Sequence, residues 1–191
     1  MTSRDPRTAR TVAALEAALR ESLTGHSLDD VTVSALCRTA GVQRTSFYTH
    51  FASVPDLFTR MLTARIDAVV DLPETADLSI RQLADEFQET LVAAFRVVQA
   101  DRALFQAGFE SDASALLRRS LTELMDTRLA FALEVWAAHG AAQDVDGPVA
   151  RAFAAGGLVA SIEAWAQSDD TDARRRADSV RDQMAPWWPR A

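Results

Sequence analysis

The sequence contains no lysine, and it has one cysteine, six prolines and seven glycines in 191 residues. A single cysteine cannot build a disulfide framework, and Cys37 has no cysteine or histidine neighbour at the spacing of a zinc site. So little glycine and proline excludes collagen-like and low-complexity linker proteins. We therefore expect no metal site and no cofactor, and we interpret Cys37 as a small core hydrophobe.

Long hydrophobic runs are also missing. The longest charge-free apolar stretch, Ala152 to Ile162, is far shorter than the roughly 20 residues that a membrane-spanning helix needs. The arginine-rich start is followed by Glu16, Arg20 and Glu21 rather than by the apolar segment of a signal peptide. The sequence predicts a soluble, cytoplasmic protein with no membrane partner.

Apolar residues make up 48% of the chain, which is too many for a disordered protein and enough for a sizeable core. The net charge is -7, but it is unevenly spread. Residues 1–52 hold six arginines against five acids, whereas the rest holds 14 arginines against 22 acids. An almost neutral N-terminal segment followed by an acidic remainder is a weak indication that the N-terminal segment binds a polyanion.

Apolar residues recur at helical spacing along the whole chain, first as Val12, Leu15, Leu19 and Leu23 before Gly25. Capping boxes beginning at Ser53 and Ser79 each open a further helix. The other helices are expected over about residues 32–39, 44–50, 102–109, 113–138, 147–167 and 171–185, and Pro73 is expected to end the helix that Ser53 opens. About nine helices with short connections and no convincing strand predict an all-α fold.

The segment from residue 30 to 57 has the pattern of a helix-turn-helix. Its turn contains Gly41, which accepts the left-handed backbone of a sharp turn. The first helix offers an apolar face, and the second is expected to bury Val42, Phe47 and Phe51. The opposite face of the second helix carries donors and no acid, so it can bond base edges and phosphates without repelling them.

These residues resemble the DNA-binding domain of the TetR (tetracycline repressor) family of bacterial transcriptional regulators. The resemblance covers about residues 8–60 and rests on Thr32, Ala40-Gly41-Val42, Phe47-Tyr48-Thr49-His50-Phe51 and Ser53-Val54-Pro55-Asp56-Leu57. It implies a three-helix DNA-binding domain at residues 1–52 and a helical ligand-binding and dimerisation domain at residues 53–191. The DNA-binding residues expected from the pattern are Arg4, Arg7, Thr32, Ser34, Arg44, Thr45, Ser46, Tyr48, Thr49 and His50.

Two positions depart from the family pattern. Position 43 is often a small N-cap residue such as serine, and this chain has Gln43 there. Members often carry lysine one residue after the serine that opens the fourth helix, where it contacts a phosphate, and this chain has Val54 there. One phosphate anchor is therefore expected to be missing, and Arg4, Arg7 and Arg10 are candidates to supply the charge.

For the C-terminal part, the resemblance implies a pocket for a small-molecule effector and a homodimer interface. An aromatic-rich body favours an apolar pocket, although ordinary core packing is the favoured explanation of any single aromatic residue. The candidate ligand-binding residues are Phe87, Leu91, Phe105, Phe109, Leu121, Met125 and Trp165, with Gln88, Thr90, Arg96, Gln106, Arg128 and Glu163 as polar groups among them. The small residues from Ala150 to Ser161, the last helix and the Trp187-Trp188 tail predict a homodimer through the last two helices.

The predicted function is a dimeric, sequence-specific DNA-binding regulator, namely a repressor released from its operator by a small, mostly apolar ligand. The alternative is a helical small-molecule-binding protein of the same fold with weak or no DNA binding. An enzyme is not expected, because the sequence has no glycine-rich phosphate loop and no paired histidine motif, and its three histidines lie far apart.

Overall fold

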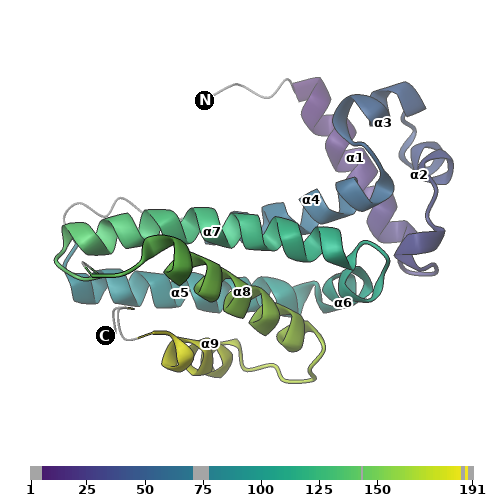
Figure 1. The fold of residues 1–191 in the computed structure, drawn as a ribbon. Helices are drawn as coiled ribbons and strands as arrows, with labels where there is room; N and C mark the ends of the chain where they lie inside the picture. Colours follow the sequence, from purple (N-terminus) through teal and green to yellow (C-terminus); the bar gives the residue numbers. More distant parts are fainter. Residues whose placement is uncertain (1–5, 71–77, 143, 186–187, 189–191) are drawn as a thin grey trace.

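The computed structural model describes residues 6–70, 78–142, 144–185 and 188. Over these residues the chain is all-helical, with nine α-helices, one short 3-10 helix and no strand, as predicted (Figure 1). The elements are α1 (Pro6–Ser22), η1 (Leu28–Asp30), α2 (Val33–Ala40), α3 (Arg44–His50), α4 (Val54–Asp67), α5 (Ile80–Ala100), α6 (Arg102–Glu110), α7 (Ser114–Ala138), α8 (Gly147–Ala166) and α9 (Ala173–Gln183).

Helices α1, α2 and α3 gather at one end of the molecule (Figure 1). The side chains of Leu15, Leu36 and Phe47 are buried there. The Thr32 hydroxyl caps α2 by accepting a hydrogen bond from the Ala35 amide at 3.2 Å. Gly41 ends α2 with a φ of 64°, the left-handed backbone that the turn requires. The predicted helix-turn-helix is therefore formed, and α3 has the expected bounds.

The rest of the molecule is a bundle in which α5, α7 and α8 are the long helices, with α6 at one end and α9 against α5 (Figure 1). Within the described part of the chain, α8 alone is long and apolar enough to span a membrane on the criteria of length and composition. About 44% of that stretch is buried, and α8 contacts α5, α6 and α7. It is thus a core helix of the bundle.

Several element boundaries differ from the predictions. Helix α1 ends at Ser22, so Leu23, the last residue of the predicted stripe, follows the helix. Helix α4 ends at Asp67, so Pro73, which lies outside the described residues, does not end it. Helix α9 is shorter than expected and is capped by Asp172, whose carboxylate accepts from the Arg175 amide. Val42 is only half-buried, so Phe47 and Phe51 supply most of the packing of α3.

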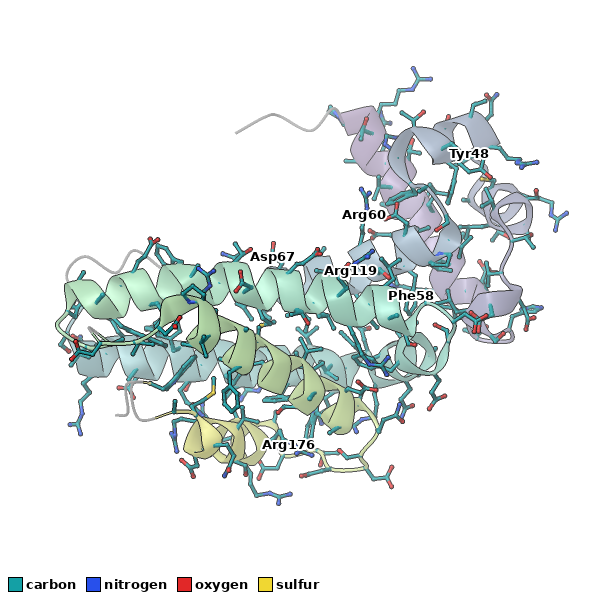
Figure 2. All side chains as sticks on the ribbon, in the orientation of Figure 1. Tyr48, Phe58, Arg60, Asp67, Arg119 and Arg176 are labelled. Atoms are coloured by element: carbon teal, nitrogen blue, oxygen red, sulfur yellow. The ribbon has the colours of Figure 1, made fainter. Side chains whose placement is uncertain are left out.

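Helix α4 joins the two parts of the molecule, since it packs on α1 as well as on α5, α6 and α7. Its Phe58 ring is fully buried at the place where these helices meet (Figure 2). Gly108 of α6 allows this contact, because a Cβ atom there would lie 2.7 Å from Phe58 Cε1 and 2.8 Å from Leu117 Cδ2. The absence of a side chain at Gly108 therefore sets how closely α4, α6 and α7 approach.

Polar contacts reinforce the same junction. Asp101, between α5 and α6, pairs with Arg20 of α1 at 3.1 Å and also with Arg65 of α4. The Asp29 carboxylate accepts a hydrogen bond from the Asp112 amide at 3.2 Å, which ties η1 to the turn before α7. The helix-turn-helix is thus held against the bundle by charged groups as well as by apolar packing.

Candidate nucleic-acid interface and ligand cavity

Helix α3 presents two different faces. Phe47 and Phe51 are buried, whereas Arg44, Thr45 and Thr49 are exposed and the Tyr48 side chain is 52% exposed (Figure 2). The Tyr48 ring packs edge-on against Phe47, with ring centroids 5.4 Å apart and an interplanar angle of 89°. The buried Phe47 ring therefore contacts one side of the Tyr48 ring, and the rest of the Tyr48 side chain faces solvent.

The remaining predicted DNA-binding residues are placed on α1, α2 and the flanks of α3. Arg7, Thr32 and Ser34 are exposed, and Ser46 and His50 are half-buried. The Thr32 oxygen already accepts the capping hydrogen bond of α2. Arg4 lies outside the described residues. The placement of these residues is compatible with a contact surface at the helix-turn-helix end, and their roles stay predictions.

The two helices of the motif carry no acidic side chain, since α2 reads VSALCRTA and α3 reads RTSFYTH. Burial raises the pKa of the Cys37 thiol, and the nearby Arg44 charge opposes that effect only partly. The thiol therefore stays protonated at neutral pH, in keeping with a core hydrophobe. Val54 is only 3% exposed, so its side chain packs inward and offers nothing to a phosphate.

A small apolar cavity lies within the bundle, between α5, α7 and α8, with a volume of about 60 Å³. Three of the seven candidate ligand residues, Phe87, Leu91 and Met125, line it. The other four do not: Phe105, Phe109, Leu121 and Trp165 are buried elsewhere in the core. Because drug-sized ligands occupy roughly 300–1,000 Å³, such a ligand would have to widen this cavity.

The tail tryptophan Trp188 forms part of the cavity wall. Its ring packs edge-on against Trp136, with centroids 4.5 Å apart, and against Phe87, with centroids 5.9 Å apart. The sequence assigned this residue to the subunit interface, and the structure places it inside its own bundle instead. Trp187 lies outside the described residues.

Polar groups around the cavity fall into two sets. Within the described lining, Thr90 and Arg128 are the polar side chains, and Arg128 is the charged one. The other predicted polar groups serve the fold or the surface: Gln88 bonds Asp178, Gln106 bonds the Ala166 carbonyl, Glu163 pairs with Arg118, and Arg96 is exposed.

Arg128 of α7 also reaches the end of α4. Its Nε and Nη2 atoms donate to Asp67 Oδ1 at 3.2 and 2.5 Å. Sequence reasoning missed this pairing, because the two residues are 61 positions apart and no local pattern connects them.

Among the described residues, no group of three or more histidine, cysteine, aspartate or glutamate side chains could hold a metal ion.

Comparison with known proteins supports the fold and the motif. Residues 15–61 match the profile of the family described as bacterial regulatory proteins, tetR family. No curated protein matches the chain significantly. The chain is similar in structure to the fatty acid degradation regulator FadR from Bacillus halodurans, at 18% identity over 94% of each chain with a TM-score of 0.59.

Two further solved structures have the same fold. The TetR family repressor AlkX from Dietzia sp. strain DQ12-45-1b, implicated in biodegradation of n-alkanes, is 16% identical over 88% of this chain and 90% of its own, with a TM-score of 0.53. The dihydroxyacetone kinase operon activator DhaS is 13% identical over 89% of this chain and 91% of its own, with a TM-score of 0.62. At these identities the likeness shows the fold alone.

The profile match thus covers the helix-turn-helix, and the structural likeness covers nearly the whole chain. Together with the exposed, acid-free face of α3, these findings show that residues 15–61 form a helix-turn-helix domain of the tetR family of bacterial regulatory proteins, and that the chain has the fold of such regulators.

Proposed function

We propose that the protein is a homodimeric, sequence-specific repressor that binds operator DNA through α3 and leaves it when a small, mostly apolar ligand binds. The observation that carries the DNA-binding part is the exposed face of α3, with Arg44, Thr45, Tyr48 and Thr49 outward and no acid among them. Arginine can bond a guanine edge through two N–H groups, and the hydroxyls suit phosphates and bases. We keep the domain boundary between residues 52 and 53, with α4 as the helix that couples the domains.

An exposed apolar stripe on α8 supports the dimer. The Phe153 side chain is 71% exposed and that of Val149 is 63% exposed, and Gly156, Ala160 and Ala164 continue the same side of the helix without a charge. Large exposed aromatics next to small residues suit a self-complementary two-fold contact in which helices approach closely. A dimer would also provide the two recognition helices that half-sites spaced about 34–36 Å apart require.

The cavity lining supports an apolar effector, because Thr90 and Arg128 are its polar side chains among the described residues. The relatives point the same way: FadR is a fatty acid degradation regulator, and AlkX is a repressor implicated in n-alkane biodegradation. Repression also needs only occupancy of the operator, whereas activation needs a further productive contact. A protein of this kind acts in the cytoplasm, where its DNA lies.

The test is fluorescence anisotropy with labelled DNA from upstream of the protein's own gene, at two salt concentrations. Arg44→Ala should weaken binding roughly 5- to 150-fold, since a bidentate base contact gives about 1–3 kcal/mol of discrimination. Arg81→Ala is the matched control, because Arg81 is an exposed arginine on α5 of the bundle, and it should bind within about two-fold of the parent.

Two results would favour the alternative, a binding protein that does not read DNA. One is equal affinity of the parent and Arg44→Ala for the upstream fragment. The other is equal affinity of the parent for that fragment and for a scrambled one. For the dimer, light scattering should give a dimeric mass that Phe153→Ser converts to a monomer, whereas Ile80→Ser on α5 should not change it.

A further inference from the structure

We infer that the cavity between α5, α7 and α8 binds an apolar carboxylate, whose carboxyl group takes the place of Asp67 on Arg128 and so releases the end of α4. This inference rests on the proposed function, in which this cavity receives the effector. It adds the chemical class of the ligand and the contact through which the ligand acts.

The ligand class follows from the wall of the cavity. Arg128 is its one charged side chain among the described residues, and the other lining groups apart from Thr90 are apolar. Phe87, Leu91 and Met125 would surround a hydrocarbon body once the cavity of about 60 Å³ has widened to admit it. Arg128 is part of that wall, and the group that its guanidinium already holds through Nε and Nη2 is a carboxylate, so an anionic group on the ligand suits it.

Asp67 is a partner that a ligand can replace. The Arg128 and Asp67 side chains are 31% and 46% exposed, so their pairing is screened by solvent and contributes little on its own. Asp67 is also the last residue of α4, where the negative end of the helix dipole disfavours a carboxylate. A ligand carboxylate would bring the same hydrogen-bonding geometry together with apolar burial that Asp67 lacks.

Replacement of Asp67 by the ligand carboxylate would affect the DNA-binding end because α4 connects that end to the bundle. Figure 2 places Asp67 and Arg60 along this helix and Phe58 where it meets α6 and α7. Helix α4 packs on α1, and its Arg65 shares Asp101 with Arg20 of α1. Loss of the Asp67 contact would free the C-terminal end of α4 and alter how the helix-turn-helix is held. By linkage, DNA binding would weaken carboxylate binding by the same factor.

The probes are dodecanoate and dodecanol, which share a twelve-carbon chain and differ in charge, used below the concentration at which they aggregate. Isothermal titration calorimetry on the full-length protein should show dodecanoate binding at least ten-fold more tightly than dodecanol. Arg128→Gln should remove that preference and leave dodecanol affinity within about two-fold. Asp67→Asn, which keeps Arg128 and removes its competitor, should bind dodecanoate several-fold more tightly.

The operator assay supplies the second readout. Dodecanoate should lower the affinity of the parent protein for the upstream DNA, and it should have much less effect on Asp67→Asn, in which the end of α4 is already released. If Arg128→Gln does not fold, Asp67→Asn still tests the inference, because the substitution is isosteric and the Asp67 side chain is half-exposed.

Three results would overturn the inference. Equal binding of dodecanoate and dodecanol to the parent would refute the carboxylate while leaving an apolar effector, and thus the proposed function, in place. Binding of neither probe, with normal operator affinity, would refute the cavity as the effector site as well. Preferential dodecanoate binding that Asp67→Asn does not strengthen would show that Asp67 is not the group being replaced.

Discussion

Replacing Gly108 by alanine tests the packing by which α4 meets the bundle. The added Cβ would lie 2.7 Å from Phe58 Cε1, 3.3 Å from Phe58 Cζ and 2.8 Å from Leu117 Cδ2. Neither neighbour can move aside easily, because both side chains are fully buried. Alanine gains about 1 kcal/mol over glycine in helix propensity, whereas overpacking a core costs about 1–3 kcal/mol. Because the added Cβ would lie below 3 Å from two buried groups, we expect the cost of overpacking at the upper end of this range.

The expected result for Gly108→Ala is a loss of about 1–2 kcal/mol in the free energy of unfolding, which in a protein of this size lowers Tm by roughly 2–8 °C. Gly157→Ala is the matched control, since Gly157 lies inside α8 and a Cβ there meets nothing within 4 Å. It should raise stability by up to about 1 kcal/mol. Both changes are made in the Phe153→Ser background, so that a contact between subunits at α8 does not affect the measured stability.

Thermal unfolding followed by circular dichroism, together with urea titration, measures both variants. The reasoning about the junction is refuted if Gly108→Ala is as stable as its background or more stable. A destabilised Gly157→Ala would instead show that α8 is packed more tightly in this monomeric background than the open space around Gly157 indicates.

Three further predictions concern single side chains. The two hydrogen bonds from Arg118 lower the pKa of Glu163. This pair should therefore add about 1 kcal/mol to the free energy of unfolding above pH ~4.3, and that contribution should be lost as the pH falls further. The prediction is contradicted if the difference in urea stability between the parent and a Glu163→Gln variant stays the same down to pH 3. Thr59→Val should raise the free energy of unfolding by up to about 1 kcal/mol, because the Thr59 hydroxyl is buried without a hydrogen-bond partner, and a loss in urea titration would argue against that. Asp101→Asn should cost about 1–2 kcal/mol, since the carboxylate holds arginines of both α1 and α4, and an unchanged midpoint in urea would show that these ion pairs contribute nothing.

Features set by residues close in sequence were predictable. The capping box of Ser79 and Gln82 forms as expected, and so does the left-handed backbone at Gly41. Each depends on atoms within a few residues of each other, which the order of residue types already determines. Even there the detail can shift: Asp56 accepts from the Ala52 amide and not from Ser53, its expected partner.

Features that depend on distant parts of the chain could not be read from the pattern. Residues that line the cavity and residues that fill the core are chemically alike, so nothing in the sequence separated Phe87 from Phe105. The Arg128–Asp67 pair joins residues 61 positions apart, and Arg20 and Asp101 are 81 apart. Such pairs are set by how the helices pack, which helical periodicity alone does not determine.

The position of Trp188 bears on how the protein should be handled. Because the indole ring of Trp188 completes a wall of the cavity, this residue is part of the surface that a ligand would meet. A truncation before residue 188 would take that ring away and open the cavity on that side. Shortened forms of the protein used for ligand screening therefore need to retain Trp188.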